Sequence, residues 1–234
     1  MIRLEKITLA FEKRTLLHDA DATLTKGTLT VLVGRNGAGK SSLLRILAAI
    51  NSPTAGQVVV NNRPLHNIPA EERAKLISFV STQRVRVTNL LCKDVVATGR
   101  APYTNWIGKI GAEDAAIISD ALASVGMVSF ADRAIDTLSD GEFQRIMIAR
   151  ALAQQTPIIL LDEPTAFLDI PTRFEICRLL ADLAHNQGKT IIFSTHDIDA
   201  AMAVCDNVAI MDNCAISLYS ATEAVDILKV LFSL

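Results

Sequence analysis

Residues 34–41 read Gly-Arg-Asn-Gly-Ala-Gly-Lys-Ser, and they constrain the fold more than any other segment of the chain. The string fits the pattern GxxxxGK[ST] and lies between a predicted strand, Thr28–Val33, and a segment with helical periodicity, Ser41–Ile50. Glycines in such a turn let the backbone curl so that successive N–H groups point at phosphate oxygens, and the helix that follows adds the positive end of its dipole. The segment predicts an α/β fold with a nucleotide-binding loop. A Gly-rich turn without a ligand is the alternative interpretation, which the strand-to-helix context disfavours.

Individual side chains of this loop have predicted roles in binding ATP and Mg²⁺. Lys40 is long enough to reach the β- and γ-phosphates, and the Ser41 hydroxyl can ligate Mg²⁺. The predicted phosphate-binding residues are Gly34, Arg35, Asn36, Gly37, Ala38, Gly39, Lys40, Ser41 and Ser42.

A pair of acidic residues, Asp162 and Glu163, follows the short apolar segment Ile158–Leu161. Such a segment is typical of a parallel strand covered on both faces, and ligands of α/β sheets bind at the carboxyl ends of these strands. Asp162 is therefore placed to hold Mg²⁺, directly or through water, and Glu163 is a candidate general base for an attacking water. An ordinary solvated turn is the alternative for the pair taken alone.

The composition excludes several classes of protein. The chain has 234 residues, of which 50% are apolar, and a formal net charge of −2. This balance disfavours disorder and gives no general attraction to nucleic acid. The mean hydropathy of +0.32 is high, but the apolar runs are far shorter than the roughly 18 residues that a membrane span needs. The surplus apolar residues are therefore expected inside the domain or against a partner.

The N-terminus and the cysteines both favour a cytosolic protein. The first residues, MIRLEKITLAFEK, carry charges where a signal peptide has its apolar region, so export is not expected. Cys92, Cys177, Cys205 and Cys214 are widely spaced and include no CxxC pair. Four free thiols are thus favoured over a disulfide framework or a zinc site.

The pattern of apolar residues predicts one α/β core interrupted by a helical insert at about residues 84–155. The insert includes a predicted helix at Glu142–Gln154, and helices at Phe174–Asn186 and Asp197–Val204 are expected after it. The predicted strands are Ile2–Leu4, Ile7–Phe11, Asp21–Leu24, Thr28–Val33, Gln57–Val60, Leu76–Val80, Ile158–Leu161, Thr190–Ser194 and Val208–Met211.

Four further motifs occur in a characteristic order along the chain. Residues 138–145, Leu-Ser-Asp-Gly-Glu-Phe-Gln-Arg, resemble the LSGGQ signature of ATP-binding-cassette (ABC) proteins. Gln83 follows a short predicted strand where that family has its Q-loop, and Ala166–Asp169 resembles the D-loop. His196, after the predicted strand Thr190–Ser194, matches the switch histidine. Together with the phosphate-binding loop, these motifs cover most of the chain, which therefore resembles an ABC ATPase.

The resemblance implies a fold and a division of the chain. The fold class is α/β: a P-loop NTPase of the ABC type with a mixed β-sheet core, an N-terminal antiparallel β-subdomain and a helical insert. Residues 1–234 would form a single ABC ATPase domain. Residues 1–83 and 156–234 would make the RecA-like core with the antiparallel subdomain, and residues 84–155 the helical subdomain. The short tail after Met211 leaves little room for a regulatory domain.

The resemblance also implies a homodimer in which two chains hold two ATP molecules head to tail. Ser139 and the backbone N–H of Gly141 would contact the γ-phosphate bound to the opposite subunit, and Asp169 of the D-loop would join the nucleotide site. Phe11 would stack on adenine, although a core phenylalanine in a strand is an equal alternative. The implied catalytic residues are Glu163, His196, Gln83 and Lys40, and the implied Mg²⁺ ligands are Ser41, Gln83 and Asp162.

Two residues depart from the signature pattern. Asp140 occupies one of the two glycine positions of the LSGGQ signature, and Glu142 occupies the position where the signature has Gln. An extra carboxylate near phosphate is unfavourable by Coulomb repulsion unless it points away. Since Gly141 remains, we expect altered ATP affinity rather than lost activity.

Residues 94–103, Asp-Val-Val-Ala-Thr-Gly-Arg-Ala-Pro-Tyr, resemble the V-x-x-GR-x-P-(Y/H) segment of importers for ferric siderophores, haem and cobalamin. Residues 161–170 resemble the same subfamily. The alternative is a loop in which Gly99 and Pro102 merely shape a turn. The resemblance implies two membrane permease subunits, a periplasmic or surface substrate-binding protein as an indirect partner, and a peripheral location at the cytoplasmic face of the inner membrane. A zinc or manganese importer, or a soluble ABC ATPase acting on ribosomes or DNA, remains a competing interpretation.

Overall fold

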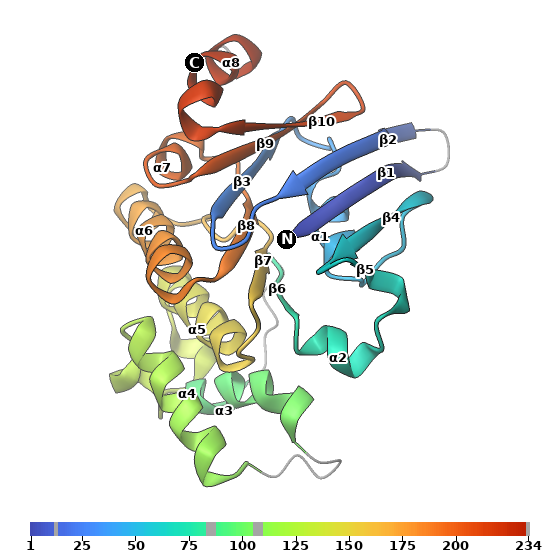
Figure 1. The fold of residues 1–234 in the computed structure, drawn as a ribbon. Helices are drawn as coiled ribbons and strands as arrows, with labels where there is room; N and C mark the ends of the chain where they lie inside the picture. The colour runs from blue at the N-terminus through green and yellow to red at the C-terminus, as the bar shows by residue number, and fades with distance from the viewer. Residues whose placement is uncertain (12–13, 83–87, 105–109, 233–234) are drawn as a thin grey trace.

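The computed structural model describes residues 1–11, 14–82, 88–104 and 110–232. Its strands form a four-stranded antiparallel sheet in the order β2-β1-β4-β5 and a six-stranded mixed sheet in the order β10-β9-β3-β8-β7-β6 (Figure 1). These sheets and the helices between them confirm the predicted α/β class. The strands are β1 (Ile2–Phe11), β2 (Arg14–Leu24), β3 (Leu29–Gly34), β4 (Ala55–Val60), β5 (Arg63–Pro64), β6 (Ile77–Val80), β7 (Ile158–Leu161), β8 (Thr190–Ser194), β9 (Asn207–Asp212) and β10 (Ala215–Ser220).

The antiparallel sheet is built from longer strands than the sequence pattern predicts. The expected strands 2–4 and 7–11 are one strand, β1, which continues through shifts in its pairing with β2. Lys6, at the shift, has a φ of 51°, so this residue interrupts the alternation that a regular strand would show. Gly56 of β4 lies against it, where a β-carbon would overlap the Lys6 carbonyl oxygen. Only glycine fits this close approach.

The six-stranded sheet is covered on both faces, which explains its continuous apolar strands. All residues of β3, β7 and β8 are buried. Within β3, Val31 and Val33 pack into one hydrophobic cluster, and Leu32 packs into the other, on the opposite face. The strands β6, β7, β8, β3 and β9 run parallel, so their carboxyl ends meet at one edge, where α/β sheets bind ligands.

Helices follow these strands and connect them. Between β6 and β7, the described residues form α3, α4, α5 and three short 3₁₀ segments, and Figure 1 shows α3 and α4 at the end of the molecule away from β10 and α8. Among the described residues, no helix is long and apolar enough to cross a membrane. The α-helices are α1 (Lys40–Leu47), α2 (Ala70–Ala74), α3 (Cys92–Ala97), α4 (Ala112–Ser124), α5 (Asp140–Ala153), α6 (Ile170–Gln187), α7 (Ile198–Met202) and α8 (Ala221–Phe232).

The segment 94–103 has a structural role at the end of α5. A β-carbon on Gly99 would overlap the carbonyl oxygen of Arg150, so this segment packs directly on the helix. The Arg100 side chain is buried, donates to Asp114 Oδ1 at 2.8 Å, and donates to the carbonyl oxygen of Ala153 at 2.9 Å. These contacts satisfy a C-terminal carbonyl of α5.

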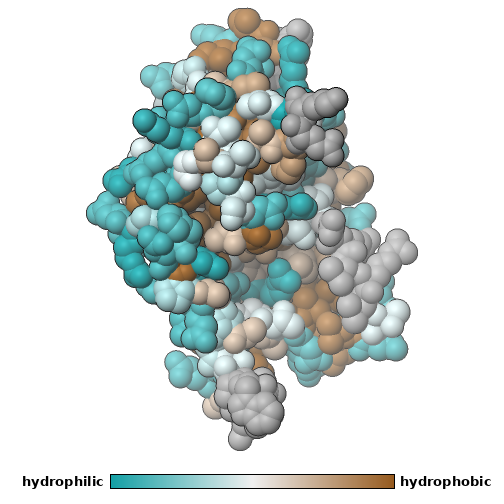
Figure 2. Space-filling view, turned by 90° about the vertical axis from the view of Figure 1, so that its right-hand side faces the viewer, coloured by the Kyte–Doolittle hydropathy of each residue, from teal (hydrophilic) through white to brown (hydrophobic). Residues whose placement is uncertain are grey.

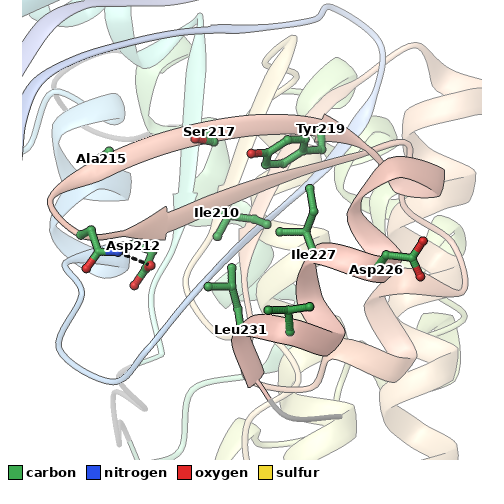
Figure 3. A pocket seen from close by; sticks show the side chains of 10 residues that line it. Ile210, Asp212, Ala215, Ser217, Tyr219, Asp226, Ile227 and Leu231 are labelled. Carbon is green, nitrogen blue, oxygen red and sulfur yellow. Dashed lines mark hydrogen bonds between the residues drawn. The ribbon is translucent and has the colours of Figure 1, made fainter.

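The chain after Met211 is more structured than the sequence pattern suggests. It forms β10, which pairs antiparallel with β9, and then α8. Ala224 and Leu228 of α8 are buried in the core. Figure 3 shows Ile210, Ile227 and Leu231 lining a groove of about 660 Å³ between α8 and the β9–β10 hairpin.

Candidate functional site

The glycine-rich loop joins β3 to α1 at the carboxyl edge of the parallel sheet. Gly37 and Gly39 adopt φ angles of 76° and 101°, which a residue with a β-carbon rarely adopts. The Lys40 side chain is buried, and its Nζ donates to the carbonyl oxygen of Gly34 at 2.9 Å and that of Arg35 at 3.5 Å. Burial lowers the pKa of Lys40, and the carboxylates of Glu163 and Asp162 act in the opposite direction.

The antiparallel sheet lies directly against this loop. A β-carbon on Gly39 would be 3.0 Å from Leu16 Cδ1, and one on Gly37 would be 3.4 Å from Arg14 Nη1. Phe11 pairs with Arg14 across the β1–β2 hairpin and is 49% exposed. Its exposure excludes the core-phenylalanine alternative and leaves the ring available for a ligand.

Asp162 connects the loop to two neighbouring strands. Its carboxylate oxygen Oδ1 accepts hydrogen bonds from the Ser41 hydroxyl and from the Ser194 hydroxyl, each at 2.8 Å. Ser194 ends β8, the strand beside β7, and its hydroxyl also accepts from the backbone N–H of Glu163 at 2.9 Å. Ser194 is a site residue that the motifs did not predict. The sequence signal that could have found Ser194 is a hydroxyl residue at the end of an apolar strand, two residues before His196.

Glu163 and His196 meet at the same edge. His196 Nε2 lies 2.5 Å from Glu163 Oε1, with 26% of the glutamate side chain and 48% of the imidazole exposed. Glu163 adopts a φ of 49°, a conformation that a non-glycine residue keeps only where its surroundings hold it. The structure thus brings together four predicted residues from three separate segments: Lys40, Asp162, Glu163 and His196.

The signature residues lie at the N-terminus of α5. Ser139 caps this helix: its backbone N–H donates to Glu142 Oε2 at 2.8 Å, its hydroxyl donates to the same oxygen at 2.9 Å, and the Glu142 N–H donates back to Ser139 Oγ at 3.3 Å. The hydrogen bonds from the Ser139 backbone and hydroxyl lower the pKa of Glu142. The Glu142 carboxylate is therefore directed back at its own N-cap, Ser139.

Gly141 and Asp169 contribute to the packing of α5 against α6. A β-carbon on Gly141 would lie 2.7 Å from Thr172 Cγ2, and Asp169 caps α6 by accepting from the Thr172 N–H at 3.2 Å. No described contact joins Ser139, Gly141 or Asp169 to the phosphate-binding loop of the same chain. Gln83 lies outside the described residues.

The arrangement can bind a phosphate chain and transfer a phosphoryl group to water. The loop N–H groups and Lys40 suit an anionic triphosphate, and the hydroxyl of Ser41 beside the carboxylate of Asp162 supplies the hard oxygen ligands that Mg²⁺ prefers. Glu163 in contact with His196 supplies a proton acceptor. Fold and site together define a P-loop nucleoside triphosphatase.

Comparison with known proteins narrows this class. The profile of the ABC transporter family matches residues 17–166 of this chain. The achromobactin transport ATP-binding protein of Dickeya dadantii is 35% identical to this chain, over 98% of the chain and 86% of the relative. The chain therefore belongs to the ABC transporter family, which confirms the resemblance seen in its motifs, and like the ATP-binding subunits of that family it is an ATPase.

Further relatives and a solved structure agree with this membership. The iron(3+)-hydroxamate import ATP-binding protein of Bacillus subtilis is 36% identical over 84% of this chain and 73% of the relative. The cobalamin import ATP-binding protein of Halobacterium salinarum is 36% identical over 84% of this chain, which spans 49% of that relative. The dimeric ATP-binding cassette MJ0796 bound to ADP and phosphate superposes with a TM-score of 0.81 at 27% identity, over 94% of this chain and 99% of that one.

Proposed function

We propose that this chain is the ATP-hydrolysing subunit of an importer for an iron chelate, such as a ferric siderophore or haem, or for cobalamin. The observation that carries the proposal is the convergence of Ser41, Asp162 and Ser194 with the Glu163–His196 contact at one edge of the sheet. The functions of the relatives, achromobactin transport, iron(3+)-hydroxamate import and cobalamin import, supply the substrate class.

In the proposed mechanism the chain first binds the triphosphate. The N–H groups of the glycine-rich loop, which includes Arg35 and Asn36, and the ammonium of Lys40 hold the β- and γ-phosphates, while Phe11 stacks on the adenine. Ser42, in the first turn of α1, would add its N–H to this set. Ser41 and Asp162 would hold Mg²⁺, since their oxygens converge within 2.8 Å, and Gln83 would complete the ligands. When bound, the ion neutralises phosphate charge.

Hydrolysis depends on Glu163 as the proton acceptor. Water attacks the γ-phosphorus, the bond from that phosphorus to the β–γ bridging oxygen breaks, and the proton of the water passes to the Glu163 carboxylate. His196 holds one oxygen of this carboxylate, and Ser194 holds the backbone N–H of the same residue, so both fix the direction of the base. The products are ADP and phosphate.

The signature and the D-loop complete the site in a head-to-tail homodimer. Ser139 and Gly141, with Asp169, would face the nucleotide bound by the second subunit, which explains why no described contact joins them to their own loop. Closure of the dimer on ATP would switch the conformation of two membrane permease subunits, and hydrolysis would reopen the dimer. The chain would thus work at the cytoplasmic face of the inner membrane, beneath permeases that receive their substrate from a binding protein on the other side.

The test is uptake by the reconstituted complex. The chain is co-expressed with candidate permease subunits from its own genome, the complex is placed in liposomes, and uptake of a radiolabelled ferric siderophore, of cobalamin and of free Zn²⁺ or Mn²⁺ is measured with ATP inside. We expect chelate or cobalamin uptake that is abolished by Glu163→Gln. Uptake of the free metal alone would replace the proposed substrate with a divalent ion, and co-purification with ribosomes instead of a membrane complex would overturn the transport function.

A further inference from the structure

We propose that Arg173 is a positioning residue that fixes the loop carrying Glu163 to the loop carrying His196. The inference rests on the proposed catalytic function of these two residues and concerns a side chain that no sequence motif singled out. Arg173 lies in the first turn of α6, with 35% of its side chain exposed. Its hydrogen bonds reach both loops.

The guanidinium group of Arg173 makes one hydrogen bond to each loop. Its Nε donates to the carbonyl oxygen of Leu168 at 2.7 Å, and its Nη1 donates to Asp197 Oδ2 at 2.7 Å. Asp197 follows His196 directly in the chain and also caps α7 by accepting from the Ala200 N–H at 3.4 Å. A planar guanidinium with donors in a fixed fork holds two acceptors at a set separation, which an ammonium does not.

A second connection joins the same two loops on the buried side. The hydroxyls of Thr165 and Thr195 lie 3.0 Å apart, and both side chains are buried. The N–H of Asp197 donates to Thr195 Oγ1 at 2.9 Å. These connections add to the contacts of Glu163 with His196 and Ser194, and a small cavity of about 160 Å³ between the loops is lined by Glu163, His196 and Arg173 among others.

The loop that Arg173 holds is exposed where a second subunit would contact it. Phe167 is 86% exposed and adopts a φ of 65°, whereas the next residue, Leu168, is buried. A non-glycine residue with this φ must be held by its surroundings, and the bond from Arg173 to the Leu168 carbonyl holds it. Contact of the second subunit with Phe167 would thus be transmitted through Arg173 and Asp197 to the loop that carries His196.

The test separates the positioning of the base from ATP binding. Arg173→Met keeps the aliphatic stem and removes both donors. We expect kcat for ATP hydrolysis to fall about tenfold or more, since misplacing a reacting group by about 1 Å can cost a hundredfold. We expect KM and the affinity for a fluorescent ATP analogue to change less than about threefold, and ATP-dependent dimer formation in the Glu163→Gln background to persist.

Arg173→Lys should recover part of the rate of ATP hydrolysis. The matched control is Arg178→Met, which removes an exposed arginine from the same helix and should leave kcat unchanged.

Several results would overturn this assignment. These are an unchanged kcat in Arg173→Met, a loss carried by KM or by ATP affinity, loss of the trapped dimer, or an equal loss in Arg178→Met, which would indicate a general effect on α6. Absence of ATP hydrolysis in the wild-type chain and its complex would instead contradict the proposed function, so the two failures are distinguishable.

Discussion

At the scale of single residues, Glu163 is the side chain whose loss should separate ATP binding from hydrolysis. Glu163→Gln keeps the shape of the side chain and removes its basicity, so turnover should fall at least about a hundredfold while ATP remains bound and dimers accumulate. Phosphate release and size-exclusion chromatography with ATP measure the two properties. Glu71→Gln, at an exposed position of α2, is the matched control. Turnover at the wild-type rate would remove Glu163 from the role of base.

Ser194 should contribute both to stability and to turnover. Ser194→Ala removes the hydroxyl that donates to Asp162 and accepts from the Glu163 N–H, and it leaves that N–H without this acceptor. A buried polar group that loses its partner costs about 1–3 kcal/mol, so the free energy of unfolding in urea should fall by that amount. We also expect a lower kcat, because the direction of Glu163 is less fixed. A free energy of unfolding equal to that of wild type would contradict this role.

The site residues that could be predicted stand next to a recognisable local pattern. Lys40 ends the glycine-rich string, and Asp162 and Glu163 follow an apolar strand directly. Ser194 was missed because its importance depends on the pairing of β7 with β8, which no local pattern encodes. Arg173 was missed for the same reason, since its two acceptors belong to different loops that meet only in the fold.

At the scale of secondary-structure elements, short polar caps fix where several helices begin. Ser220 and Glu223 form such a cap on α8: the Ser220 hydroxyl and backbone N–H donate to Glu223 Oε2 at 2.7 and 3.0 Å. The hydroxyl bond first, and the backbone bond second, lower the pKa of Glu223 below its ordinary value of 4.5. The ionised cap therefore stabilises the fold above about pH 4.5, and this contribution is lost as the pH falls through the lowered pKa.

A single substitution tests this pH dependence. Glu223→Gln cannot change its charge, so its melting temperature should fall less than that of wild type between about pH 5 and pH 3, measured by circular dichroism. Glu71→Gln, which lies outside any such cap, should follow the wild-type curve. An identical acid-induced fall in wild type and Glu223→Gln would show that the ionised cap contributes no stability.

The pattern of apolar residues predicts some strands and helices better than others. The buried strands β7 and β8 were predicted at their observed bounds, since a short continuous apolar run between polar residues is typical of a parallel strand covered on both faces. The pattern did not predict β10 and α8. β10 is an edge strand without a fully buried residue, and α8 packs through a few side chains such as Ala224 and Leu228. Edge elements bury little apolar surface, so their patterns are weak.

At the scale of the whole molecule, the apolar excess is mostly internal. Two clusters cover opposite faces of the six-stranded sheet and contain most of the buried apolar side chains. On the face drawn in Figure 2, the hydrophobic surface forms several separate patches among hydrophilic residues. The most exposed large apolar residues of the described chain, Phe167 at 86% and Val230 at 83%, lie in the loop before α6 and on α8. The first of these lies in the D-loop segment through which the proposed dimer would form.

In the proposed dimer, Ser139 of one subunit faces the nucleotide of the other. Ser139→Arg places a long cation where the second subunit's nucleotide would approach, so the chain should bind ATP normally and remain a monomer. Light scattering in the Glu163→Gln background measures the oligomer with ATP present, and titration with a fluorescent ATP analogue measures binding. Because losing the N-cap of α5 costs about 1 kcal/mol, Ser139→Asn, which retains a capping side chain, is the control for helix stability. Ser124→Arg, at an exposed serine of α4, is the control for added charge. Dimers of normal strength in Ser139→Arg would mean that the signature of one subunit does not close the nucleotide site of the other.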